Sequence, residues 1–206
     1  MDLTIVTVAP KKDRVLKDIW LAGVKRWFPG AKVIMQPADQ RFTPGSNQHA
    51  AGLNAAMKKV TTEHVLILDL DCVVLSNKWW SPKITVLGGR KPAGANTMHM
   101  AFLCGRTEIF KSYDFMPKSP RPTADTDVGS ELGLLNADLE FRNCKKGGCK
   151  HFDKTYQVQE IYYRNKLIAC HYGRGSNLSG KVQKTDKPLS DQYSMWLQRM
   201  YLANRK

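Results

Sequence analysis

The sequence predicts an open α/β fold in which helices flank a mostly parallel central sheet. Up to about residue 68, short apolar or β-branched runs alternate with segments of helical periodicity, the pattern of β-α-β units. The apolar run that starts at Val65 ends in two aspartates one residue apart, and open α/β sheets bind their ligands beyond the carboxyl ends of their strands. Alternating, basic segments after residue 138 predict a small β-rich C-terminal portion.

The first half of the chain contains strands and helices in alternation. A β-branched run makes residues 3–8 a buried strand. Asp13 is the expected N-cap of an amphipathic helix that stops at Pro29-Gly30. The elements expected next are a strand, a loop with two prolines, a second helix and a third strand, at residues 32–35, 37–46, 47–59 and 65–68.

The second half has a less regular pattern. After residue 75 we expect an irregular segment with a short strand at residues 84–87 and then a buried strand at residues 98–104. The later elements are a turn or short helix, a helix, a few short strands and a last helix capped by Ser190, at residues 106–113, 129–135, 138–172 and 191–203. A length of 206 residues suits one domain over residues 1–206.

The chain is strongly basic. It has 32 Lys or Arg residues and 18 Asp or Glu residues, a formal net charge of +14. Residues 142–187 alone hold eleven basic and three acidic residues, a net charge of +8. Such an excess predicts attraction to polyanions, nucleic acid foremost, with a strong dependence on salt.

Composition also indicates the compartment. No apolar run approaches the roughly 18 to 20 residues needed to span a bilayer, and the N-terminal stretch lacks the features of a signal peptide. The odd number of cysteines, which are Cys72, Cys104, Cys144, Cys149 and Cys170, suits reduced thiols. We therefore expect a cytoplasmic protein without membrane association, in the host cytoplasm if the chain is viral.

Asp69 and Asp71 are the chemical centre of the sequence. Both follow the buried run VLIL, where an unpaired carboxylate is costly, so they predict a cation or a polar ligand at the end of that strand. Residues i and i+2 point to the same side of a strand, and at the end of a strand they can converge on one divalent cation together with a phosphate. A capping or turn role is the alternative for such a pair.

These segments resemble the GT-A fold family of nucleotide-sugar glycosyltransferases. The matching pieces are IVTVAP at the start, SNQHAAGLNAAMKKV before the strand and ILDLDC with its D-x-D. Gly105, Asp127 in TADTD and His171 in CHYGRGS follow in the order that the family shows. The resemblance covers roughly residues 3–176, and it departs from the family at Thr126, where an acidic residue is common.

The resemblance implies a GT-A-like domain with a nucleotide-sugar-binding half, residues 1–100, and an acceptor-binding half, residues 101–206. It implies a metal held by Asp71 and His171, and oxygen and imidazole ligands suit Mn²⁺ or Mg²⁺. Asp127 is the expected general base of a hexosyl or pentosyl transfer that inverts the anomeric carbon, with retention as the alternative if Asp127 lies on the other side of the sugar. The residues implied for binding the donor, a nucleoside-diphosphate sugar with UDP favoured, are Ala9, Pro10, Lys12, Asn47, Asp69, Asp71 and Arg174.

Charge and resemblance together suggest a DNA acceptor, as in bacteriophage enzymes that glycosylate hydroxymethylated pyrimidines. A base hydroxyl inside a duplex must be flipped out to reach Asp127. A glycan or small-molecule acceptor stays open. So does a non-enzymatic nucleic-acid-binding protein, although that reading leaves the D-x-D unexplained.

The same run also resembles the first motif of haloacid-dehalogenase-type phosphatases. In that reading Asp69 is the phosphorylated nucleophile and Asp71 the acid/base. A complete β-α-β unit before the motif disfavours it.

Separately, Cys144, Cys149 and His151 are spaced as C-x4-C-x-H, which is not a common zinc pattern, so a basic hairpin is favoured over a zinc site.

Overall fold

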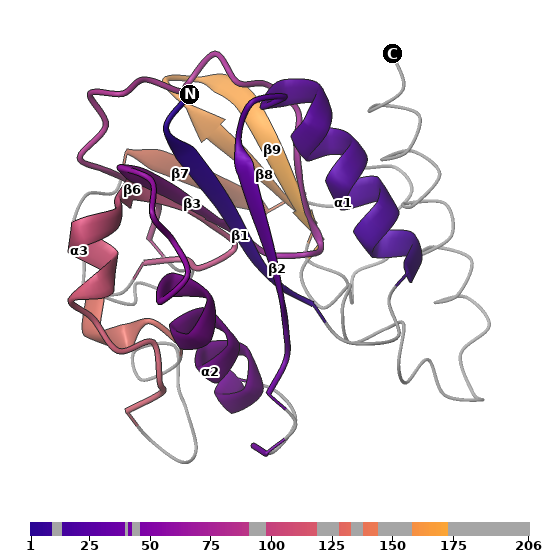
Figure 1. Cartoon of the computed structure of the whole chain (residues 1–206). Coiled ribbons are helices and arrows are strands. Elements are labelled where there is room, and N and C mark those ends of the chain that lie inside the picture. The colour runs from indigo at the N-terminus through magenta and orange to yellow at the C-terminus, as the bar shows by residue number, and fades with distance from the viewer. Residues whose placement is uncertain are drawn as a thin grey trace.

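The chain folds into two sheets with helices packed on the first of them (Figure 1). The computed structural model describes residues 1–9, 14–39, 41–42, 46–90, 98–118, 128–132, 138–143 and 158–172. The first sheet has five strands in the order β2-β1-β3-β6-β5, and the second has four in the order β4-β9-β8-β7. In the part of the chain described, no helix has the length and apolar character needed to cross a bilayer.

Three parallel strands form one side of the first sheet. β1 (Leu3–Ala9) lies between β2 (Lys32–Pro37) and β3 (His64–Leu68) and pairs in parallel with both. Every residue of β1 and β3 is buried, as expected of apolar strands covered on both faces. The predicted open α/β architecture is confirmed.

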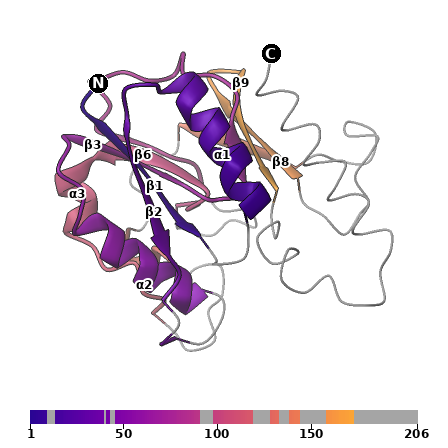
Figure 2. The same cartoon turned by 45° about the vertical axis from the view of Figure 1, so that its right-hand side comes forward.

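Helices α1 (Arg14–Trp27) and α2 (Ser46–Met57) cover opposite faces of these strands (Figures 1 and 2). Alternate strand residues point to opposite faces, so β1 sends Leu3 and Ile5 to the core under α1 and Val6 and Val8 to the core under α2. The expected N-cap of α1, Asp13, lies outside the described residues.

The remaining two strands of the first sheet are antiparallel. β6 (Phe102–Arg106) pairs with β3, and the short β5 (Val86–Leu87) pairs with β6. The strand predicted at residues 98–104 thus begins four residues later. The chain turns before it because the N–H of Ala101 donates to His99 Nδ1 at 3.2 Å.

Short helices follow β6. The predicted turn or short helix at residues 106–113 is α3 (Thr107–Lys111), which lies beside α2 (Figure 2). Where a helix was predicted at residues 129–135, the described part is a 3-10 helix, Ser130–Leu132. The helix predicted at residues 191–203 lies outside the described residues.

The second sheet is antiparallel and includes a strand that the sequence analysis did not predict. β4 (Cys72–Val74) begins one residue after Asp71 and pairs with β9 (Lys166–Tyr172). The other two strands, β7 (Leu139–Asn143) and β8 (Val158–Tyr163), confirm the predicted β-rich C-terminal portion. β8 and β9 form a hairpin through Arg164 and Asn165, whose φ angles of 49° and 60° are those of a type I′ turn, the two-residue turn that matches the right-handed twist of the strands.

Candidate metal centre

Asp69 and Asp71 lie at the corner where the chain leaves the first sheet and enters the second. Asp69 directly follows β3, and its N–H donates to the carbonyl of Ala101 at 3.1 Å. The N–H of Cys72 donates to the carbonyl of Asp69 at 2.9 Å, which closes a four-residue turn. Backbone hydrogen bonds therefore fix the main chain of residues 69–72 in a tight corner, from which both carboxylates project.

The pairing of β4 with β9 brings His171 to this corner. Cys72 stands opposite His171 in the antiparallel register, so His171 lies beside Asp71. His171 Nε2 is 3.4 Å from Asp71 Oδ1 and 3.9 Å from Asp69 Oδ2. One ligand atom from each of the three residues lies within 4.8 Å of the others, a spacing that one cation can bridge.

The cluster is largely shielded from water. The side chains of Asp71 and His171 are 5% and 9% exposed, and that of Asp69 is 20% exposed. Two carboxylates so close together in a low dielectric repel each other, and a bound cation removes that cost. Two carboxylate oxygens and one imidazole nitrogen fit a divalent ion such as Mn²⁺ or Mg²⁺.

Gln159 orients the histidine. On β8, Gln159 stands directly opposite His171, and its Oε1 lies 2.9 Å from His171 Nδ1. An amide oxygen only accepts hydrogen bonds, so Nδ1 carries the proton. The lone pair of Nε2 then points toward the carboxylates, as in a metal-ligating histidine held by an outer partner.

The carboxylates also change the protonation of His171. Burial lowers the pKa of its imidazole, but Asp71, by charge and hydrogen bonding, and Asp69, by charge, outweigh burial and raise the pKa above its ordinary value. In the absence of a cation, a proton on His171 therefore offsets part of the negative charge. The same proton competes with a metal ion for Nε2.

His99 and Phe141 form one wall of the site. The ring of His99 stacks on Phe141 with centroids 4.4 Å apart and meets the ring of His171 edge to face at 5.3 Å. Phe141 comes close because Gly89 lacks a side chain, since a Cβ there would lie 2.5 Å from its ring. The wall closes one side of the cluster with aromatic surface.

A second histidine reaches the cluster from α2. His49 Nε2 lies 3.3 Å from Asp69 Oδ1. The two atoms are within ion-pair distance, but the angle is not that of a hydrogen bond. Asp69 thus has one oxygen toward His49 and the other toward His171.

Two of the residues expected to bind the donor lie at the same edge of the sheet. Ala9 is buried at the carboxyl end of β1, which runs parallel to β3, and Asn47 is half-buried in the first turn of α2, two residues before His49. The other expected site residues, Pro10, Lys12, Asp127 and Arg174, and the C-x4-C-x-H residues Cys144, Cys149 and His151, lie outside the described residues.

Two of the residues around the cluster, Gln159 and His99, were not singled out from the sequence. Gln159 is a polar residue at a buried position of a strand, and that position was the one available signal for it. His99 occurs in an ordinary sequence context, and the turn before β6 brings it to the cluster, as the packing of α2 brings His49 there.

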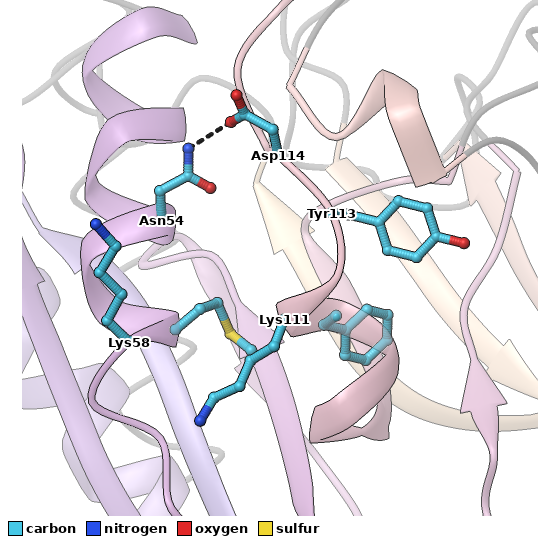
Figure 3. A pocket seen from close by; sticks show the side chains of 7 residues that line it. Asn54, Lys58, Lys111, Tyr113 and Asp114 are labelled. Atoms are coloured by element: carbon cyan, nitrogen blue, oxygen red, sulfur yellow. Dashed lines mark hydrogen bonds between the residues drawn. The ribbon is translucent and has the colours of Figure 1, made fainter.

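A cavity lies between α2 and α3 (Figure 3), and none of its lining residues belongs to the cluster. It has a volume of about 440 Å³, with Met57 and Phe110 among its lining residues. Asn54 Nδ2 donates to Asp114 Oδ1 at 2.5 Å, and Lys111 Nζ donates to the carbonyl of Val60 at 2.7 Å. Both hydrogen bonds connect the segment of α2 with that of α3, so they stabilise the contact between them.

A second cavity, of about 540 Å³, lies between the segment after β4 and the turn of the β8–β9 hairpin. Its lining includes the half-buried rings of Trp80 and Tyr163 and three exposed cations, Lys78, Lys83 and Arg164. Asp138 also lines the cavity, and the guanidinium of Arg164 lies over the ring of Tyr163, 5.1 Å from its centroid. The hairpin turn is at the opposite end of β9 from His171, and the five residue steps from Lys166 to His171 span about 17 Å.

Comparison with known proteins gives partial structural likenesses. No protein-family model matches the chain, and a search of curated proteins finds no match. The apo form of the glycosyltransferase GlyE of Streptococcus pneumoniae TIGR4 aligns with 53% of this chain and 35% of its own, at 15% identity and a TM-score of 0.40. The chain therefore spans about a third of the length of that protein.

Two other solved structures are similar to a comparable degree. An active-site mutant of LgtC aligns with 54% of this chain and 60% of its own, at 12% identity and a TM-score of 0.36. The protein A197 from STIV aligns with 89% of this chain and 99% of its own, at 10% identity and a TM-score of 0.42.

Proposed function

We propose that this chain is a metal-dependent glycosyltransferase, which moves a sugar from a nucleoside-diphosphate sugar to an acceptor hydroxyl. The observation that carries the proposal is the cluster of Asp69, Asp71 and His171 at the carboxyl edge of parallel strands. Ligands of open α/β sheets bind at that edge. A buried cluster of two carboxylates and an imidazole there suits a cation that itself binds an anionic substrate.

The chemistry of sugar transfer explains why two carboxylates and an imidazole stand here as metal ligands. A nucleoside diphosphate leaves readily when its developing charge is neutralised, and a divalent cation supplies that neutralisation as a Lewis acid. Asp71 and His171 hold the cation and Asp69 completes its ligands, while Gln159 keeps His171 in the ligating tautomer. Mn²⁺ or Mg²⁺ is the proposed ion.

The donor lies along the edge formed by β1, β3 and the start of α2. Ala9 and Asn47 stand there, and backbone N–H groups in the first turn of a helix favour a phosphate. Pro10, Lys12 and Arg174 are proposed to complete the nucleotide site, with UDP as the favoured nucleotide. The transferred hexose or pentose then faces the acceptor-binding half, residues 101–206.

Asp127 is the proposed general base, with inversion at the anomeric carbon. The role rests on the resemblance, in which Asp127 stands at the acidic motif. Of the described residues near it in sequence, Gly129 lies against Met100, since a Cβ there would lie 2.4 Å from Met100 Sδ. Met100 follows His99, which stands on the wall of the cluster. A general base contributes about 10² to 10⁴ in rate.

The proposed acceptor is a hydroxymethylated base in DNA. The net charge of +14 supports a polyanionic acceptor, and so do Lys78, Lys83 and Arg164, which line a cavity with two half-buried aromatic rings. Cations and aromatic side chains together suit a nucleic-acid backbone and its unstacked bases. A glycan or small-molecule acceptor is the alternative for the same enzyme.

The sheet order weighs against a phosphatase with Asp69 as nucleophile. The phosphatase family that the run resembles also uses a Ser or Thr, a Lys and a late acidic pair at the ends of further strands. The neighbour of β3 on that side, β6, is antiparallel, so its carboxyl end lies at the opposite edge. Among the described strands of the first sheet, only β1 and β2 share the carboxyl edge with β3.

Transfer of labelled sugar tests the proposal directly. Purified protein is incubated with MnCl₂ and a panel of labelled nucleoside-diphosphate sugars, in the presence of hydroxymethylated DNA, unmodified DNA or oligosaccharide acceptors. We expect label in the modified DNA and none after addition of EDTA. Phosphate release from a generic ester without any sugar transfer would instead support the phosphatase.

A further inference from the structure

The two oxygens of Asp69 face different partners. Oδ2 is 3.9 Å from His171 Nε2, on the side of the cluster that Asp71 shares. Oδ1 is 3.3 Å from His49 Nε2, on the side of α2. A carboxylate held at one oxygen can present the other to a cation in a fixed direction.

The backbone of His49 is fixed by close packing. Its neighbour Ala50 and Leu53, one helical turn further along α2, are fully buried against the sheet. Gly52 lets α2 approach β1 closely, since a Cβ at that position would lie 2.7 Å from Val8 Cγ1. The first turn of α2 therefore cannot move away from the cluster without separating a packed interface.

The imidazole of His49 has a nitrogen that the fold does not otherwise use. His49 Nε2 is buried and has no hydrogen-bond partner among the described residues. A buried N–H without a partner costs about 1 to 3 kcal/mol, and Asp69 Oδ1 is the carboxylate oxygen within reach. A small rotation of either side chain brings the pair into hydrogen-bond geometry.

We propose that His49 is a positioning residue, which donates its Nε2–H to Asp69 Oδ1 and thereby directs Oδ2 at the cation bound by Asp71 and His171. This inference rests on the metal site of the proposed function. It adds a hydrogen-bond partner for Asp69 that comes from α2. Together with Gln159 behind His171, it gives two of the three ligands a fixed orientation. Loss of such an outer partner typically weakens metal binding 10- to 100-fold.

Two substitutions separate the positioning role from side-chain volume. In His49→Gln, the amide nitrogen can occupy the place of Nε2, so we expect Mn²⁺ affinity within about threefold of wild type. In His49→Asn, the amide reaches only the place of Nδ1, so we expect the affinity to fall about tenfold or more. The full chain is titrated with MnCl₂ alone, by calorimetry and by the loss of the free-ion electron paramagnetic resonance signal.

Gln48→Leu is the matched control, because Gln48 is in the same turn of α2 and donates to the carbonyl of Phe42 rather than to the cluster. We expect it to bind Mn²⁺ like wild type. Melting temperatures in EDTA show whether each variant is folded, and His49→Gln with retained affinity also excludes a general loss of structure. Equal affinities of wild type, His49→Gln and His49→Asn would overturn the positioning role alone. Absence of Mn²⁺ binding by wild type would overturn the metal site and this inference with it.

Discussion

Asp71 Oδ1 and His171 Nε2 lie 3.4 Å apart, although the two residues are one hundred positions apart in the chain. The contact depends on a strand of only three residues, β4, whose register with β9 places Cys72 opposite His171. The second sheet thus delivers the imidazole to a pair of carboxylates that the first sheet presents. A site assembled from both sheets requires that both stay packed together.

Replacement of Asp71 by Asn should abolish the response to a metal-bound nucleotide. Wild-type protein bound to Mn²⁺ and UDP at about 100 times the dissociation constant gains about 2.7 kcal/mol, which raises the melting temperature by about 5 to 10 °C for a chain of this size. In Asp71→Asn the shift should disappear, because one charged ligand is lost. Asp18→Asn, an exposed substitution of the same kind on α1, should keep the full shift. A persistent shift in Asp71→Asn would remove Asp71 from the site.

Replacement of Gln159 by Leu should weaken both the fold and the metal site. The Nδ1–H of His171 would be left buried without its acceptor, which costs about 1 to 3 kcal/mol in the free energy of unfolding. Mn²⁺ affinity should fall about 10- to 100-fold, because the imidazole loses its fixed tautomer and orientation. Urea unfolding in EDTA measures the first effect, and a manganese titration measures the second. Gln159→Glu, which keeps an acceptor at the same place, should retain more affinity than Gln159→Leu.

The metal-free protein should lose stability between neutral and mildly alkaline pH. The pKa of His171 is raised in the folded protein above its ordinary value of 6.5, so the folded state holds this proton more tightly than the unfolded state. The contribution of this proton to the free energy of unfolding is complete when the pH is below the pKa of His171 in the unfolded chain. It is lost as the pH rises through the pKa of His171 in the folded protein. Urea unfolding in EDTA from pH 6 to 8.5 should show the decline, and His171→Gln should flatten it. An equal decline in both proteins would assign it to other groups.

The pattern of local residues was sufficient to predict the central strand and its carboxylates, because an apolar run that ends in two aspartates is visible within ten residues. The alternation of strands and helices likewise indicated β1, α1, β2, α2 and β3 in order. β4 could not be predicted in this way. Its residues continue the apolar run after Asp71, and its partner β9 lies almost a hundred residues later.

The outer partners of the site depend on tertiary packing and register. Whether Gln159 faces His171 depends on the β8–β9 register, which is irregular between Ile161 and Tyr162. A shift by one residue would move every side chain of the strand to the other face. His49 reaches Asp69 only because Gly52 allows α2 to lie close to Val8. A single glycine within a helix is not enough to predict that contact from the sequence.

Substitution of Gly52 by Ala should destabilise the protein through that same contact. The added Cβ would lie 2.7 Å from Val8 Cγ1 and 3.0 Å from Cγ2, and a β-branched side chain in a buried strand has little room to rotate. We expect a loss of about 1 to 3 kcal/mol in the free energy of unfolding, with weaker Mn²⁺ binding as α2 shifts. Gly30→Ala is the control, since nothing lies within 4 Å of its added Cβ. Its stability should be unchanged or slightly higher. Equal stabilities of the two variants would show that α2 relaxes without cost.

DNA binding, if DNA is the acceptor, should depend on the cations around the second cavity. Affinity for a duplex should fall linearly with salt on a double-logarithmic plot, with a slope set by the number of phosphate contacts. The double substitution Lys83→Ala and Arg164→Ala should reduce that slope by about 0.9 for each phosphate contact removed. Lys58→Ala, at the cavity between α2 and α3, should leave the slope unchanged. Because the second cavity lies about 17 Å along β9 from His171, roughly five base pairs of duplex, one bound DNA can reach both places. Salt-independent binding, or a slope equal in all three proteins, would exclude this surface as the DNA site.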